Sequence, residues 1–211
     1  MKTYYKFLKL DGKKIVSAHG NSPWVIGEWR EDKRIPKNCE RGFHCSDDIY
    51  QAFSFVAGTV LAKVEVGGKS DVDVDKSSHQ KMRIVQAWEW DKTTSIKLAI
   101  YAAELVIDIY EKQYSKDDRP RKAIEAAKKY LKKPTADAAY AARDAAYAAD
   151  AAADAARAAA YAADAAADAA DAAYAAYAAA YAAARAAADA DLTKKINTYM
   201  LKLAKDLKEL K

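Results

Sequence analysis

Hydrophobic and polar residues alternate along the first part of the chain, which is the pattern of a half-buried β-strand. The alternation is clearest in Thr59–Val66 and returns in Met82–Trp90. An aromatic-rich segment, Lys2–Lys9, is followed by Asp11-Gly12, a dipeptide typical of a hairpin turn, and then by Lys14–Ala18. These segments predict a mainly antiparallel sheet.

A short helix is expected between the predicted strands. Ser46 and the two acidic residues after it are typical of a helix N-terminus, with Ser46 as the cap. The helix is expected over Ile49–Ala57 and ends at Gly58, and Gly67-Gly68 is expected to form a turn. Pro23–Trp29 is interpreted as a short extended or loop segment.

The composition changes near residue 92, because all seven glycines occur by Gly68 and all four tryptophans by Trp90. We therefore expect an α+β domain over residues 1–92 and a helical, alanine-rich domain over residues 93–211. The predicted fold class is α+β, with a small antiparallel sheet domain followed by an alanine-rich antiparallel helical bundle.

Helical periodicity governs the second part. A broad apolar face predicts a helix over residues 95–114, formed by Ile96, Ala99, Ile100, Ala103, Val106, Ile107 and Tyr110. Acidic residues and Pro120 begin the next helix, over 118–133, which stops before Pro134. Thr135 is expected to cap the alanine-rich tract that follows.

The alanine tract carries its polar residues on one stripe. From Tyr140 to Asp171 the non-alanine residues, apart from Asp144, are spaced three and four apart, which places them on one side of a helix. The spacing then changes, so the stripe rotates by about half a turn near residues 168–177. This change predicts a turn or kink there, and helices over about 135–170 and 174–209.

Charge is segregated along the chain. The formal net charge is +5, yet the alanine tract holds eight Asp against three Arg, so the rest of the chain is strongly basic. No apolar signal core follows Met1, and the tract is too polar to span a membrane. We expect a cytoplasmic protein with no membrane partner and no sequence-specific nucleic-acid partner.

Motifs for chemistry are sparse. Cys39, His44 and Cys45 could be three metal ligands, but no second Cys or His pair has finger-like spacing, so reduced structural thiols are the preferred interpretation. No phosphate-binding glycine loop, serine-nucleophile motif or zinc-protease motif is present. We expect a binding protein rather than an enzyme, with no cofactor and no metal.

Two resemblances bear on function. Residues 117–127, with the sequence DDRPRKAIEAA, precede a Thr-initiated alanine tract and resemble the alanine-rich, helical immunity proteins of bacterial polymorphic-toxin systems. Residues 39–45 and 61–68 resemble a small uncharacterised domain of phage and bacterial proteins. These resemblances imply a role in conflict between phage, bacteria and their toxins. A fainter resemblance joins Gly42–Ser46 and Val60–Val66 to the ADP-ribosyltransferase fold, with Glu89 in the place of the catalytic glutamate.

The polar stripe supplies the candidate ligand-binding residues. Tyr offers stacking faces, Arg offers bidentate phosphate contacts, and Asp accepts hydrogen bonds from sugars or bases. The candidates are Tyr140, Arg143, Tyr147, Asp150, Arg157, Tyr161, Tyr177, Tyr181 and Arg185. A stripe that only faces water, or one that binds a protein, stays open.

The sequence thus predicts a protein that sequesters a small nucleotide-like immune signal, in a homo-oligomer. The alternatives are an immunity-type inhibitor that binds a protein toxin and an ADP-ribosyltransferase-like enzyme in the first domain.

Overall fold

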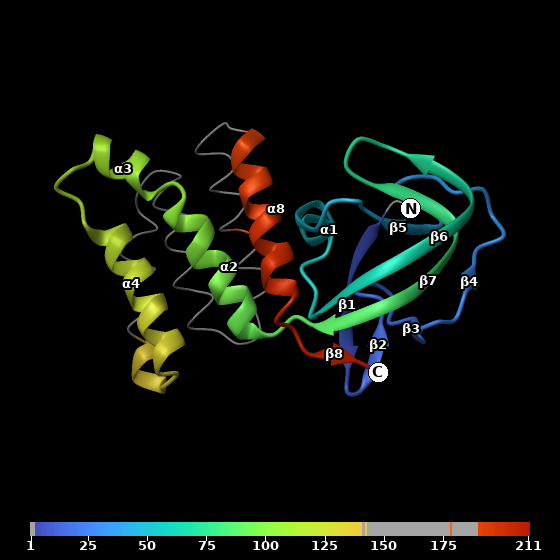
Figure 1. Cartoon of the computed structure of the whole chain (residues 1–211), viewed down its shortest axis with the longest axis horizontal. Helices are drawn as coiled ribbons and strands as arrows, with labels where there is room; N and C mark the ends of the chain where they lie inside the picture. The colour runs from blue at the N-terminus through green and yellow to red at the C-terminus, as the bar shows by residue number, and fades with distance from the viewer. Residues whose placement is uncertain (1–2, 141, 143–177, 179–189) are drawn as a thin grey trace. The chain divides into compact units, whose positions relative to one another are not determined.

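The computed structural model describes residues 3–140, 142, 178 and 190–211, and it combines an antiparallel sheet with several helices (Figure 1). The chain divides into two compact units. The first holds residues up to Trp90 together with Met200–Lys211, and the second holds Asp91–Tyr199. The sequence had assigned everything after residue 92 to the helical part.

The first unit is built on one sheet. Its strands in the described part of the chain are β1 (Tyr4–Asp11), β2 (Lys14–Val16), β3 (Pro23–Trp24), β4 (Arg30–Glu31), β5 (Phe43–Cys45), β6 (Val60–Val72), β7 (Ser77–Glu89) and β8 (Glu209–Leu210). The main path runs β3-β2-β1-β6-β7-β4, and all these pairs are antiparallel. The predicted antiparallel sheet is therefore confirmed.

The hairpin predicted at Asp11-Gly12 joins β1 to β2, with Asp11 opposite Lys14. Gly12 has φ +59°, a left-handed conformation that glycine adopts without steric cost.

The turn predicted at Gly67-Gly68 is wrong, because both glycines lie inside the long strand β6. The pairing register with β7 shifts between Gly67 and Ser70, and Gly68 has φ +75°. These glycines therefore form a bulge, and the chain reverses later, between Val72 and Ser77.

The free edge of β7 is covered by several short segments. β5 pairs with residues 77–79, β4 with 81–82 and β8 with 87–88, while Ile26 bridges Ile84. Covering an edge in this way removes a surface on which another chain could add a strand. The same arrangement brings β4 and β5 to one end of β7.

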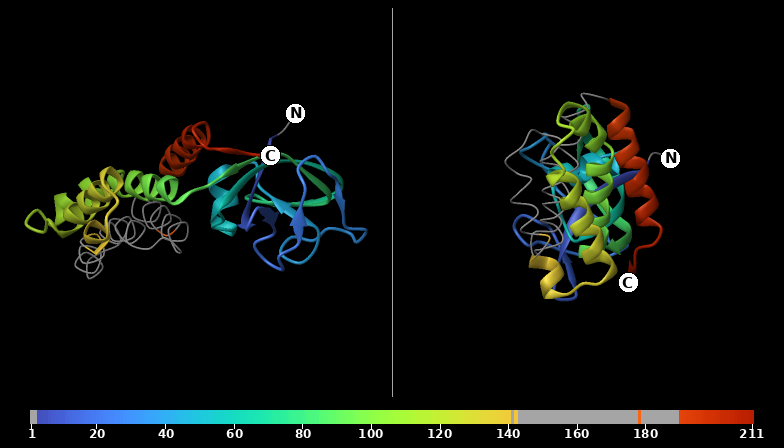
Figure 2. Two further views of the ribbon diagram at one scale, coloured as in Figure 1. Left: turned by 90° about the horizontal axis from the view of Figure 1, so that it is seen from below. Right: turned by 90° about the vertical axis from the view of Figure 1, so that its left-hand side faces the viewer.

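Each face of the sheet carries its own buried residues. Leu8, Trp24 and Ile84 belong to a cluster on one face. On the other face, the rings of Phe7 and Phe53 lie 4.8 Å apart and both contact Trp90, with α1 (Ile49–Phe55) packed on β1 (Figure 2).

The cap of α1 differs from the prediction. Asp48, rather than Ser46, accepts the capping hydrogen bond from the Gln51 amide, at 3.0 Å. The Ser46 hydroxyl instead donates to the carbonyl oxygen of Asp75 at 2.7 Å, so it ties the helix start to the β6–β7 connection. The helix also ends two residues earlier than expected, at Phe55.

The second unit contains α2 (Lys92–Glu104), α3 (Ile107–Gln113), α4 (Arg119–Lys132) and the start of α8 (Ala190–Ala204). The single helix predicted over 95–114 is broken, because Val106 leaves helical geometry with φ −121° and ψ −9°. The break still lets Val106, Ile107 and Tyr110 be buried. Among the described residues, no helix has the length and apolarity to cross a membrane.

The alanine tract falls almost entirely outside the described residues, and so do its predicted stripe and turn. At its start, Thr135 is the cap as predicted, since its Oγ1 accepts from the Ala138 amide at 3.2 Å. At the other end the predicted helix to residue 209 is wrong. α8 ends at Ala204, because Glu209 and Leu210 pair with β7 instead.

Candidate functional site

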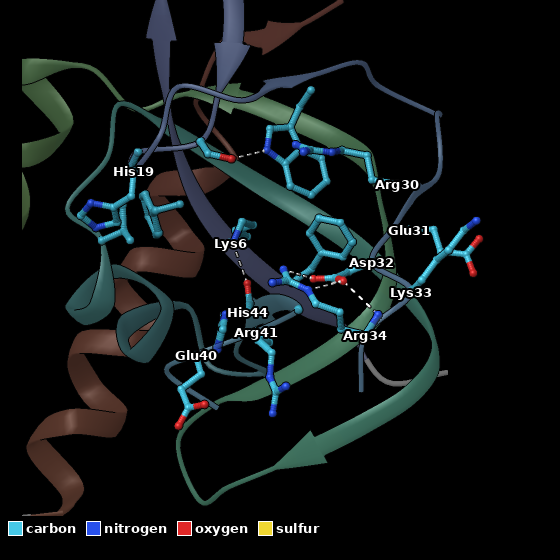
Figure 3. Close-up of a pocket in the computed structure, with 17 residues that line it drawn as sticks. Lys6, His19, Arg30, Glu31, Asp32, Lys33, Arg34, Glu40, Arg41 and His44 are labelled. Carbon is cyan, nitrogen blue, oxygen red and sulfur yellow. Dashed lines mark hydrogen bonds and ion pairs between the residues drawn. The ribbon is translucent and has the colours of Figure 1, made fainter. Parts of the chain in front are cut away.

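The first unit contains a cavity of about 630 Å³ beside β1 (Figure 3). Its walls come from β1, from the residues after β2, from β3 and β4, and from the segment leading into β5. The polar lining residues are Lys6, Ser17, His19, Arg30, Glu31, Asp32, Lys33, Arg34, Glu40, Arg41 and His44, and the aromatic ones are Phe7, Trp24 and Phe43.

Lys6 occupies an inward position on β1, in step with the buried Leu8 two residues on. Its Nζ donates to the carbonyl oxygen of His44 at 2.7 Å. No carboxylate of the described residues lies within ion-pair distance of this ammonium. Burial lowers the pKa of Lys6 to about 8; Cys45 opposes this shift and Arg30 adds to it. A partly buried cation therefore faces the cavity with no counterion in the part of the chain that the structure describes.

Arg30 is the second inward cation. Its guanidinium carbon lies 4.4 Å from the ring centroid of Trp24 and 5.4 Å from that of Phe43. Its Nη1 donates to the Pro23 carbonyl at 3.2 Å, and Trp24 is itself held by a 2.9 Å hydrogen bond from Nε1 to Ser17. Burial lowers the pKa of Arg30, so the site holds this charge against a desolvation cost.

The carboxylates of the cavity are already neutralised by partners. Asp32 accepts from Arg34 Nη2 at 2.8 Å, which holds the pKa of Asp32 well below its usual range. Glu31 pairs with Lys81 at 3.3 Å. Glu40 pairs with Lys37. Figure 3 shows Glu31 pointing away from Lys6, toward the edge of the site.

The balance of charge is therefore positive. The described lining residues of the cavity include five Lys and Arg against three carboxylates, and two of those carboxylates are paired with lysines outside the lining. Such a cavity attracts small anions.

The loop before β5 fixes the position of His44. The amide of Cys39 donates to His44 Nε2 at 2.9 Å, and Cys39 has φ +64°. Burial lowers the pKa of His44, and Lys6 lowers it further, so the ring is neutral at pH 7 with its proton on Nδ1. At Gly42 a Cβ atom would lie 2.5 Å from Ser78 Oγ, so the loop needs glycine there.

A second cavity, of about 310 Å³, adjoins the first. It shares Lys6, Phe7, His19, His44 and Val56 with the larger one. Its remaining lining residues are Tyr5, Cys39, Cys45, Ala52, Phe55 and Lys76. Lys76 lies 4.6 Å from the ring centroid of Phe55, and a hydrogen bond with Cys39 raises the pKa of Lys76.

The residues that the sequence predicted to bind a ligand belong to the alanine tract, and only one of them is described. Tyr140 is described and is 60% exposed. Arg143, Tyr147, Asp150, Arg157, Tyr161, Tyr177, Tyr181 and Arg185 lie outside the described residues. Sequence reasoning missed Lys6 and Arg30. The sequence did offer one signal for Lys6, which is a lysine at an inward position of the aromatic-rich first strand.

Three other sequence-based candidates were a catalytic glutamate, a pair of cysteines and a metal site. Glu89 is at the end of β7, where its Oε2 lies 3.0 Å from Lys208 Nζ, and it lines neither cavity. Cys45 is buried and Cys39 is exposed, and they form no disulfide. In the described ranges no group of three His, Cys, Asp or Glu residues is arranged to hold a metal ion.

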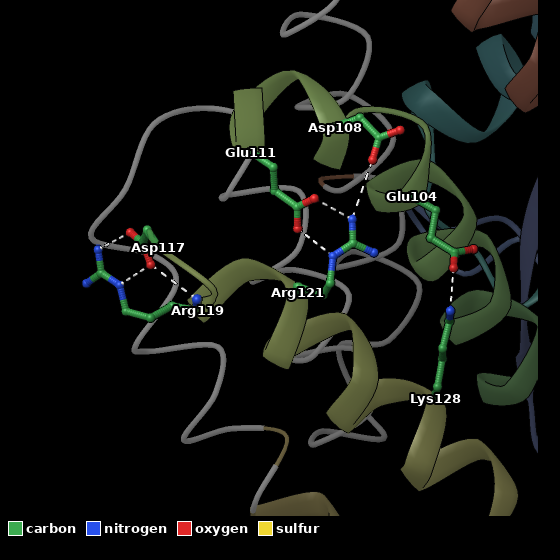
Figure 4. Close-up of polar contacts among 7 residues, drawn as sticks. All are labelled: Glu104, Asp108, Glu111, Asp117, Arg119, Arg121 and Lys128. Atoms are coloured by element: carbon green, nitrogen blue, oxygen red, sulfur yellow. Dashed lines mark hydrogen bonds and ion pairs between the residues drawn. The ribbon is translucent and has the colours of Figure 1, made fainter. Parts of the chain in front are cut away.

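The signature near Pro120 connects two helices (Figure 4). Arg121, on α4, pairs with Glu111 and Asp108 on α3. Arg119 Nη2 lies 2.5 Å from Asp117 Oδ2, and the Tyr110 hydroxyl donates to the same carboxylate at 2.6 Å. These contacts give the two arginines of the signature a role inside the fold.

A model of a domain of unknown function, DUF7666, matches residues 4–96. The match spans β1 to β7 and the start of α2, so every lining residue of both cavities lies within it. No curated protein and no solved structure matches the chain.

Proposed function

We propose that the first unit binds a small phosphate-bearing, nucleotide-like anion in the larger cavity, and that the protein sequesters this ligand without transforming it. The observation that carries the proposal is the Lys6 ammonium, which faces the cavity without a carboxylate partner among the described residues. The site moves from the alanine tract, where the sequence placed it, to the sheet.

The energetics of a buried cation support this assignment. An ammonium removed from water is costly unless it is paired, and the described residues give the three donors of Lys6 one hydrogen bond. A bound phosphate oxygen would supply the missing acceptor. Arg30, fixed against Trp24, adds a planar guanidinium of the kind that binds phosphate in two-point contacts.

The biological setting rests on the resemblances of the sequence. The likeness of residues 117–127 to immunity proteins supports a cytoplasmic role in phage–bacterium conflict, in which the ligand is an immune signal and the protein is a homo-oligomer. An inhibitor that covers a protein toxin is the alternative on the same ground.

An ADP-ribosyltransferase-like activity is a second candidate, favoured by one observation. Gly42, Phe43 and His44, which carry that resemblance, line the larger cavity. Against it, Glu89 is paired with Lys208 and lines neither cavity. Intact NAD after prolonged incubation with the protein would exclude the enzyme and leave binding.

The test is a thermal-shift titration with inorganic phosphate, pyrophosphate and linear and cyclic nucleotides. We expect a concentration-dependent rise in melting temperature that Lys6→Met abolishes. The matched control is Lys9→Met, a lysine of the same strand that lines neither cavity. No shift with any phosphate-bearing compound, or an equal shift in Lys6→Met, would contradict the proposal.

A further inference from the structure

The two cavities of the first unit meet at one side-chain boundary. Both are lined by Lys6 and His44, and the hydrogen bond from Lys6 Nζ to the His44 carbonyl lies at that boundary. A ligand that reaches Lys6 from the larger cavity is therefore next to the smaller one.

The chemistry of the two cavities differs. Charged side chains dominate the larger one, whereas the smaller has an apolar wall made by Phe7, Ala52, Phe55 and Val56. No Asp or Glu is among the described residues that line the smaller cavity. A phosphate has no apolar surface to bury there, but a flat heterocycle does.

Polar groups at the edge of the smaller cavity favour a heterocycle over a plain hydrocarbon. Tyr5, His19 and Lys76 line it together with the apolar wall. A nucleobase presents two apolar faces for stacking and a rim of donors and acceptors, which matches such a lining. Phe55, which is 43% exposed, offers its ring at this wall.

The boundary itself suits the middle of a nucleotide. Lys6 can contact a phosphate oxygen there, and the His44 ring beside it lines both cavities, with its own N–H already donated to the Gly42 backbone. The Cys39 amide holds the His44 ring by donating to its Nε2, and the loop packs closely against Ser78 at Gly42. These groups are therefore in place before a ligand binds.

We propose that the ligand is a nucleoside phosphate held in two parts, with its base in the smaller cavity and its phosphate against Lys6 and Arg30 in the larger one. This inference rests on the proposed function and specifies its ligand class. It distinguishes the site from one that binds any small phosphate.

The experiment compares four kinds of probe by isothermal titration on the full chain: inorganic phosphate, ribose 5-phosphate, the four nucleoside 5′-monophosphates and the matching nucleosides. We expect at least one monophosphate to bind about tenfold or more tightly than ribose 5-phosphate, since base stacking supplies the difference. Phe55→Ala should remove that advantage and leave ribose 5-phosphate binding unchanged. Trp29→Ala, an exposed aromatic that lines neither cavity, is the matched control.

The outcomes separate the two proposals. Equal affinity for ribose 5-phosphate and every monophosphate overturns the two-part ligand and leaves phosphate capture standing. The two-part ligand is also overturned if Phe55→Ala loses affinity for ribose 5-phosphate as well as for the monophosphates while its melting temperature stays native. If none of the phosphate-bearing probes binds, both proposals fail.

Discussion

The guanidinium of Arg30 lies over the ring of Trp24, 4.4 Å from its centroid, and faces the larger cavity. We expect Arg30→Gln to weaken phosphate binding about tenfold or more, because a hydrogen bond to a charged group contributes about 1.5–3 kcal/mol. The measurement is titration calorimetry with the tightest phosphate-bearing probe.

Arg83 provides the matched control for Arg30. It also lies over a tryptophan, 5.0 Å from the ring centroid of Trp29, but lines neither cavity. Arg83→Gln should leave the affinity within twofold of the native value. Equal losses in the two variants would mean that Arg30 acts only through the fold.

The titration of Lys6 sets a pH dependence. Its pKa is lowered to about 8, so its charge is present below that pH and lost above it. An anion binds the charged form, and we expect affinity for a phosphate monoester to fall roughly tenfold between pH 7 and pH 9, a range in which the ligand stays dianionic. Calorimetry across this range measures the slope.

The Lys6→Arg variant shows whether Lys6 or another titrating group causes the pH dependence of binding. Arginine stays charged throughout the range, so this variant should show a flat profile whatever its affinity at pH 7. A profile as steep as that of the native protein would show that another group controls binding.

Gly58 lies where the residues after α1 pass β1. A Cβ atom there would be 2.2 Å from the carbonyl oxygen of Leu8, which belongs to the backbone. We expect Gly58→Ala to lower the free energy of unfolding by about 3 kcal/mol, as overpacking against a backbone does. At Gly67 the nearest atom would lie 3.8 Å away, so Gly67→Ala, measured by the same denaturant titration, should cost much less.

Some of these features could be predicted from the sequence. The alternation in Thr59–Val66 is a local signal, and strands formed at this segment and at Met82–Trp90, although β6 runs on to Val72 and β7 begins at Ser77. The bulge at Gly67-Gly68 was missed because glycine is equally typical of a turn, and only the facing strand decides between the two. The cavity was missed for a similar reason: Lys6, Arg30 and His44 are brought together by strand pairing between distant residues.

The end of the chain shows how tertiary pairing overrides a local pattern. Leu203, Leu207 and Leu210 have helical spacing, which predicted a helix to residue 209. Leu210 instead lies opposite Ala87 on β7 and packs against the sheet core. The gain from completing a sheet edge is not visible in the spacing of these leucines.

Pairing of β8 with β7 should be measurable by amide hydrogen exchange. The Glu89 amide donates to the Lys208 carbonyl at 2.9 Å. Removing residues 207–211 deletes that acceptor, so we expect faster exchange at Glu89 and a lower melting temperature. The amide of Ala62, in the centre of the sheet, is the internal control. If its exchange accelerated as much as that of Glu89, the truncation would have destabilised the whole sheet.

Tyr110 links α3 to Asp117, two residues before the start of α4, through a 2.6 Å hydrogen bond from its hydroxyl. We expect Tyr110→Phe to lower the free energy of unfolding by about 1 kcal/mol, because the ring stays and only the hydroxyl is lost. Tyr114→Phe is the control, since the described residues give its hydroxyl no hydrogen bond. An equal loss in the two variants would place the effect outside the Asp117 contact.

The pairing of β8 also has a consequence for synthesis. Strand β7 ends at Glu89, but the segment that covers its last residues is not made until Glu209 and Leu210 have been translated. During that interval residues 90–208 are translated, and the nascent chain holds a sheet with part of one edge open. Synthesis of the first unit starts early, but its sheet is completed only when the last strand is made. The open edge of β7 can therefore mispair for as long as the second unit is being translated.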